Sequence, residues 1–157
     1  MSIITKIKEK LAQYKINKLR KTERKRAYVD WDKINRILLL YSINNAPEAQ
    51  SSRIYSELYE ILDKCFNEKT NVRLMVCVNK SQLEQKRFNI SVFDAKSCNA
   101  LTYQPSEDIL SITEEEDSDV VINLSPELSF PLEYLAERSD AKLKISALKT
   151  GKGAKYD

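Results

Sequence analysis

The sequence predicts an α/β fold: an open, mostly parallel, five-stranded Rossmann-like sheet with helices on both faces, preceded by a projecting basic N-terminal helix. Three observations support this prediction. The expected strands are short runs of apolar residues, which is the pattern of strands buried on both faces. Segments with helical periodicity lie between these runs. Two strand–helix–strand segments, 34–78 and 119–146, each indicate a right-handed βαβ crossover.

The segment 119–146 is the clearest of these units. Its first strand is the apolar run 120–124. Ser129, followed two residues later by Pro131, is typical of a helix start. Apolar residues then recur three and four positions apart, so one side of this helix is expected to face a core. The next strand covers 142–146.

The other elements follow from the same rules of periodicity and capping. We expect a helix over 2–27, strands over 34–43, 72–78 and 88–93, and helices over about 47–68 and 105–116. The chain then divides into a basic amphipathic helical arm (1–30), a single Rossmann-like α/β domain (31–148) and a polar tail (149–157) that we expect to be frayed.

Composition excludes several classes of site. The 157 residues fit one domain and contain no histidine, which removes Ser-His, Cys-His and His-metal chemistry. The two glycines, Gly151 and Gly153, follow no predicted strand, so a phosphate-binding glycine loop is excluded. Metal-ligand spacing is also missing from the sequence. We therefore expect no cofactor, no metal and no small-molecule ligand.

Evidence for catalysis is sparse. The carboxylates of Asp94, Glu127 and Glu133 are isolated, and no spacing pairs them for acid–base work. The three cysteines are an odd, unclustered set, and we expect reduced thiols of a cytosolic protein. The sequence therefore favours a non-catalytic adaptor or binding module, although an enzymatic role stays open.

The charge distribution gives the best functional signal. Residues 1–26 hold ten Lys or Arg and two Glu, a net charge of +8, whereas the remainder holds 16 Lys or Arg and 21 Asp or Glu, a net charge of −5. Apolar residues form a stripe on the first half of the arm: Ile3, Ile7, Leu11 and Tyr14. The second half is almost entirely basic, with Lys15, Lys18, Arg20, Lys21, Arg24, Lys25 and Arg26.

Three partners fit this arm. An anionic membrane surface would accept the apolar stripe and attract the lysines, placing the protein at the inner face of a membrane. If the partner is RNA, the basic half would neutralise its phosphate charges, and binding would weaken steeply as the salt concentration rises. A protein partner could instead pack on the stripe. Residues 3–14 favour lipid, and residues 15–26 favour phosphate.

A possible ligand crevice lies elsewhere, at the carboxyl ends of the predicted strands. Ligands of doubly wound sheets bind there, and the polar residues at this position are Ser42, Asn44, Asn123 and Ser125. The same residue types are also ordinary helix caps. The alternative function is thus a single-lobe relative of a nucleotide-sugar or sugar-phosphate binding enzyme.

Several stretches together carry a recognisable pattern: the basic segment 6–26, the strand 119–122, the helix 130–136, Ser139 and residues 141–142. The pattern resembles an uncharacterised family of short bacterial α/β proteins that begin with a basic helix. This resemblance implies an α/β sandwich and a bacterial, cytoplasmic setting, and it implies no activity. A fainter similarity, over 119–124 and 139–142, is to the N-terminal Rossmann-like domain of heptosyltransferase-type glycosyltransferases.

Overall fold

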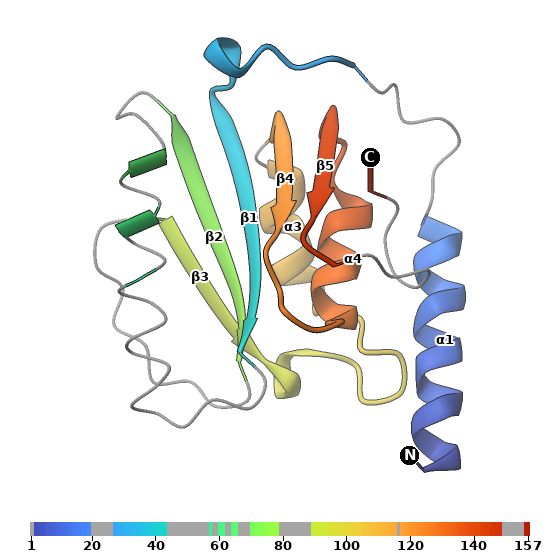
Figure 1. Cartoon of the computed structure of the whole chain (residues 1–157). Helices are drawn as coiled ribbons and strands as arrows, with labels where there is room; N and C mark the ends of the chain where they lie inside the picture. Colours follow the sequence, from blue (N-terminus) through green and yellow to red (C-terminus); the bar gives the residue numbers. More distant parts are fainter. Residues whose placement is uncertain are drawn as a thin grey trace.

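The computed structural model describes residues 2–19, 27–43, 57, 60–61, 64–65, 70–78, 89–115, 117–148 and 156–157. Its elements follow one another along the chain as α1 (Ile3–Leu19), the 3-10 helix η1 (Trp31–Lys33), β1 (Arg36–Ile43), β2 (Asn71–Val78), β3 (Asn89–Asp94), the 3-10 helix η2 (Ala95–Ser97), α3 (Glu107–Glu115), β4 (Val120–Asn123), α4 (Phe130–Arg138) and β5 (Leu143–Ser146). Figure 1 shows one twisted sheet with α3 and α4 on one of its faces and α1 beyond α4.

The strands form one parallel sheet in the order β3-β2-β1-β4-β5. β1 is central, with Leu39 opposite Leu74 of β2 and opposite Ile122 of β4. The chain builds outward from β1 first through β2 and β3 and later through β4 and β5. The direction of winding therefore changes between β1 and β4, which is the switch point of a doubly wound sheet. The predicted open, parallel, five-stranded fold is confirmed.

Alternate residues of β1 enter two separate apolar layers, as expected for a strand buried on both faces. Leu38 and Leu40 pack toward α3 and α4, in a cluster that includes Leu110 and Leu132. Residues on the opposite face, such as Leu39, pack in a second cluster formed largely by strand residues. The helix predicted over 47–68 falls mostly outside the described residues; those that are described within it, 57, 60–61 and 64–65, are helical.

The N-terminal helix is present, but it lies along α4 rather than projecting from the domain (Figure 1). Ala12 and Ile16 of α1 are fully buried against Phe130 and Tyr134 of α4. The Tyr134 hydroxyl donates a hydrogen bond to the Ala12 carbonyl oxygen at 3.3 Å. A small residue at position 12 lets the two helices approach closely, and this packing holds the arm to the domain.

The end of the described chain also folds back onto the domain. The Asp157 amide donates to the Lys144 carbonyl oxygen of β5 at 2.8 Å, and Tyr156 packs against the apolar cluster under α4. The prediction of a frayed tail is therefore wrong for these two residues. The remainder of that tail, 149–155, lies outside the described residues.

Candidate functional site

The outward side of α1 carries a row of exposed apolar side chains. Ile3 is 77% exposed, Ile7 53% and Leu11 42%. Ile4 and Tyr14 are also exposed and belong to the same row. At 3.6 residues per turn, this row is centred roughly 140° around the helix from the buried Ala12–Ile16 side. We call these five residues the outer stripe of α1.

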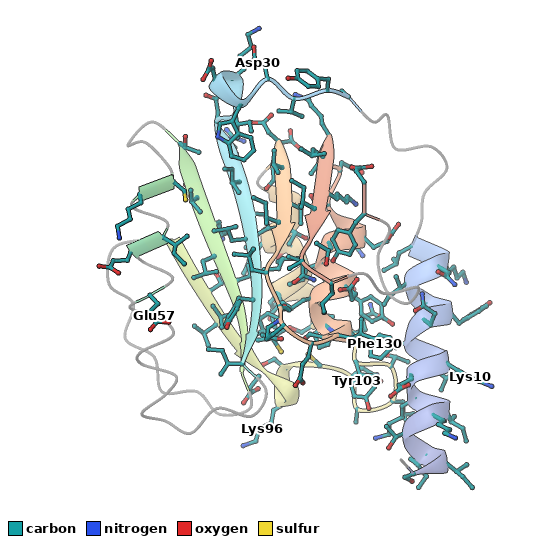
Figure 2. The ribbon with its side chains drawn as sticks, in the orientation of Figure 1. Lys10, Asp30, Glu57, Lys96, Tyr103 and Phe130 are labelled. Atoms are coloured by element: carbon teal, nitrogen blue, oxygen red, sulfur yellow. The ribbon has the colours of Figure 1, made fainter. Side chains whose placement is uncertain are left out.

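Lysines border the outer stripe. By helical geometry Lys10 and Lys15 lie about 70° to either side of its centre, and Lys18 continues it at the end of the helix. Figure 2 shows Lys10 pointing away from the domain. The Lys15 Nζ atom donates to Gln104 Oε1 at 3.2 Å, so this lysine also ties the helix to the loop 99–104. The other predicted basic residues, Arg20, Lys21, Arg24, Lys25 and Arg26, lie outside the described residues.

The loop 99–104 fixes the position of α1. Asn99 Oδ1 accepts hydrogen bonds from the amides of Leu101 and Thr102, and Tyr103 then adopts a left-handed backbone conformation with φ of 57°. This turn stacks the Tyr103 ring on Phe130, with ring centroids 5.8 Å apart. Both residues belong to the cluster that includes Ala12 and Ile16, and Figure 2 shows them on the side of α1 that faces the domain. The helix is thus held in one orientation, and its outer stripe faces away from the core.

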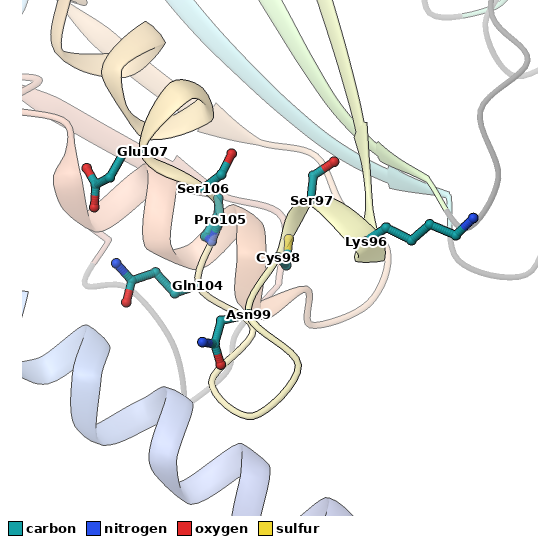
Figure 3. A pocket seen from close by; sticks show the side chains of 8 residues that line it. All are labelled: Lys96, Ser97, Cys98, Asn99, Gln104, Pro105, Ser106 and Glu107. Atoms are coloured by element: carbon teal, nitrogen blue, oxygen red, sulfur yellow. The ribbon is translucent and has the colours of Figure 1, made fainter.

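A groove of about 390 Å³ lies where this loop leaves β3 (Figure 3). Its lining is Lys96, Ser97, Cys98, Asn99, Gln104, Pro105, Ser106 and Glu107. Several of its polar atoms already have partners in the protein. The Ser97 hydroxyl donates to Asp94 Oδ1, and Gln104 Oε1 accepts from Lys15. Figure 3 shows Lys96 extending away from the other lining side chains. The groove therefore lacks a convergent set of free polar groups.

The structure brings the predicted crevice residues Ser42, Asn123 and Ser125 together. Leu40 of β1 is paired with Asn123 of β4. Ser42 and Ser125 each come two residues after this pair, so they lie next to each other at the switch point between the two strands. All three are at least 98% buried. Among the described residues, the hydroxyls of Ser42 and Ser125 have no hydrogen-bond partner. Asn44, the fourth predicted residue, lies outside the described residues.

Two residues that the sequence did not place in a site join this cluster. Glu133 of α4 is 2% exposed, and its Oε1 atom accepts hydrogen bonds from Asn123 Nδ2 at 3.0 Å and from the Tyr156 hydroxyl at 3.2 Å. Asn123 Nδ2 also donates to the Tyr156 hydroxyl oxygen at 2.9 Å. Burial and the neighbouring Glu133 raise the pKa of Tyr156, which keeps its hydroxyl protonated. The sequence analysis treated Glu133 as an isolated carboxylate, because its partners Asn123 and Tyr156 lie 10 and 23 positions away in the chain and no local spacing links them.

Two thiols lie near this end of the sheet. Burial raises the pKa of Cys77 to about 11, with a hydrogen bond to Ser129 acting in the opposite direction. Burial also raises the pKa of Cys98 to about 12, and the neighbouring Cys77 and Asp94 add to this effect. Both sulfurs are therefore protonated at neutral pH and are poor nucleophiles. All three cysteines are free, and Cys65 is exposed.

Two further properties concern the described part of the chain. No helix there is long and apolar enough to cross a membrane. The same residues contain no group of three or more acidic or cysteine side chains that could hold a metal ion.

Comparison with known proteins gives a family but no activity. No curated protein and no solved structure matches the chain, so the predicted similarity to heptosyltransferase-type domains stays a prediction. Residues 8–156 match a family that is described as a family of unknown function (DUF6913). The match begins in the first half of α1 and ends at Tyr156, so it includes the buried side of α1, the whole sheet and the Asn123–Glu133–Tyr156 cluster. The chain therefore belongs to the family of unknown function DUF6913, as the resemblance to an uncharacterised family predicted.

Proposed function

We propose that the protein is a membrane-surface binding module, and that α1 attaches it to an anionic lipid surface. The observation that carries this proposal is the orientation of α1. One side of the helix packs on α4, and the opposite side presents five large apolar side chains to solvent. Scattered exposed apolar residues are normal, but a continuous row on one helix side is typical of an interaction surface.

Lysines and apolar residues are arranged as a lipid interface requires. An interfacial helix lies in the membrane plane, with its apolar side among the upper acyl chains and its lysines at the headgroups. Lys10 and Lys15 border the outer stripe on its two sides, and each basic residue near an anionic surface contributes about 1 kcal/mol. Long lysine side chains can reach the headgroups while their stems cover apolar surface.

The charge of α1, together with its outer stripe, also favours a lipid surface over two other partners, a second copy of this chain and RNA. The helix carries five lysines and one glutamate, so a second copy packed on the same stripe would bring lysines together. RNA would satisfy the lysines, but it would leave the aliphatic residues Ile3, Ile7 and Leu11 without a matching surface. Only an anionic lipid surface, or a protein with an acidic apolar groove, satisfies both features.

Cosedimentation with vesicles tests the proposal. The full chain is mixed with vesicles that combine phosphatidylglycerol and phosphatidylcholine, and with vesicles of phosphatidylcholine alone. We expect strong binding to the anionic vesicles and weaker binding to the neutral ones. The variant Ile7→Glu/Leu11→Glu places two charges in the outer stripe and should weaken binding on the order of a hundredfold.

The matched control adds the same two charges outside the outer stripe, as Ser2→Glu just before α1 and Asn17→Glu near its end, at positions that are also exposed. This variant should bind much more tightly than the stripe variant. Equal loss in both variants would mean that net charge alone governs binding. Removal of the protein from vesicles by short single-stranded RNA would favour the nucleic-acid alternative, and no binding to either vesicle would overturn the proposal.

A further inference from the structure

The cluster of Asn123, Glu133 and Tyr156 has the geometry of a hydroxyl-recognition site. The Tyr156 hydroxyl lies between an amide that donates to it at 2.9 Å and a carboxylate that accepts from it at 3.2 Å. Asn123 and Glu133 are themselves held together at 3.0 Å and are almost completely buried. A buried donor and a buried acceptor arranged in this way can both bond to a hydroxyl group. A ligand without a hydroxyl would leave them unpaired and would therefore bind more weakly.

The backbone next to Tyr156 makes a second set of contacts. The amides of Leu143 in β5 and of Ala147 just after it donate to carbonyl oxygens of Asp119 and Asn123 on the β4 side, so the backbone groups of Lys144 face the outer edge of the sheet. At that edge the Lys144 amide donates to Asp157 Oδ2 at 2.9 Å, and the Lys144 carbonyl oxygen accepts from the Asp157 amide at 2.8 Å. An edge strand that binds an extended segment through its backbone, next to a side-chain pocket, is an established mode of peptide recognition.

We propose that the edge of β5 and the Asn123–Glu133 pocket form a recognition site for an extended segment in which a tyrosine is followed by an acidic residue. Residues 156 and 157 fill this site in cis. A partner segment of the same chemistry would replace them: its tyrosine hydroxyl would donate to Glu133, and its acidic side chain would accept a hydrogen bond from the Lys144 amide. The site lies on the sheet edge and does not use the outer stripe of α1, so it goes beyond the membrane function proposed above.

The chemistry of the cluster supports recognition over simple packing. Tyr156 already lies against an apolar cluster. If packing were the only role of these three residues, a phenylalanine in place of Tyr156 and aliphatic residues in place of Asn123 and Glu133 would fill the same space without any polar group. Burying a carboxylate and an amide is costly unless both are fully bonded. One of the hydrogen bonds that Glu133 accepts comes from the Tyr156 hydroxyl, so the site favours tyrosine over phenylalanine.

The test supplies the segment in trans to a full-length variant that lacks the occupant, Tyr156→Ala/Asp157→Ala. The probe is the acetylated and amidated dipeptide Tyr-Asp, and the control is the dipeptide Phe-Asp. Isothermal titration calorimetry should show that Tyr-Asp binds the variant about tenfold or more tightly than Phe-Asp does. Wild-type protein should bind Tyr-Asp far more weakly, because its own segment competes at a high effective concentration.

Folding of the variant is followed by circular dichroism, so that either state of the variant is informative. If the variant is folded, absence of Tyr-Asp binding overturns the proposal. If it is unfolded, Tyr-Asp should restore the folded spectrum at concentrations where Phe-Asp does not, and failure to do so overturns the proposal as well. Equal effects of the two dipeptides, or equal binding to wild-type protein, would place the binding elsewhere.

Discussion

At the scale of single residues, Asp119 connects the starts of three strands. Its Oδ2 atom accepts hydrogen bonds from the amides of Asn35 and Arg36, just before and at the start of β1. Its Oδ1 atom pairs with Lys142 Nζ at 3.4 Å, just before β5, while Asp119 itself precedes β4. Burial alone would raise the pKa of Asp119, but the two amides and Lys142 outweigh it and lower that pKa.

The first prediction concerns the substitution Asp119→Asn. We expect it to reduce the free energy of unfolding at neutral pH by about 1–2 kcal/mol, because the amide loses the charge that strengthens these hydrogen bonds. The folded-state pKa is lowered, so the stabilisation is present above the unfolded-state pKa of about 3.9 and is lost as pH falls through the folded-state value. Urea unfolding of both proteins across this pH range measures the difference.

The control is Asp117→Asn, which removes an exposed carboxylate two residues earlier in the chain. It should change the free energy of unfolding by less than about 0.5 kcal/mol at every pH. A difference between wild type and Asp119→Asn that persists undiminished at low pH would contradict the assigned role of the Asp119 charge.

At the scale of elements, α1 uses two sides for two purposes. The buried side holds Ala12 and Ile16 against α4, and the outer stripe remains exposed. The sequence pattern at spacings of four, four and three identified only the outer stripe. The buried side is harder to recognise because it combines one small and one large apolar residue, and its complement on α4 lies more than a hundred positions away, as in the Tyr134–Ala12 hydrogen bond.

The second prediction compares these two sides. Ile16→Ala should lower the free energy of unfolding by about 2–4 kcal/mol, because it leaves a cavity between α1 and α4. Ile7→Ala makes the same chemical change in the outer stripe and should alter the free energy of unfolding by less than about 0.5 kcal/mol. Urea unfolding followed by circular dichroism measures both. Comparable losses in the two variants would show that the outer stripe is also part of the folded core.

The same contrast explains how far the sequence could predict the fold and the candidate site. Local patterns suffice for the strands, since each apolar run matches an observed strand within a few residues. They also suffice to bring Ser42 and Asn123 together, because parallel strands end at one edge of the sheet. The contact of Tyr156 with Asn123 and Glu133 instead joins residues that are 33 and 23 positions apart, and no local period or spacing encodes it.

At the scale of the whole molecule, β1 organises the sheet. It pairs with β2 over eight residues and with β4 over four, so residues 37–40 lie between both neighbours. Apolar layers cover both faces of this strand. Within the described part of the chain, β3 and β5 each pair with one neighbouring strand, and α1 contacts the domain mainly through α4. The structure therefore has a central part around β1 and three peripheral parts, β3, β5 and α1. A peripheral part can separate from the domain while losing fewer contacts than β1 would lose.

The third prediction follows from this arrangement and is measured by native-state hydrogen exchange. Amides of residues 37–40 should exchange slowest, because they are released only when the whole sheet opens, whereas amides of β5 and α1 should exchange by local opening at lower free energy. Ile16→Ala should speed exchange in α1 far more than in β1, since it weakens only the contact with α4. If α1 amides exchanged as slowly as those of β1, α1 would open only together with the whole sheet, contrary to this prediction. In that case α1 would stay packed on α4 when it binds a membrane, and only the outer stripe would contact the lipid.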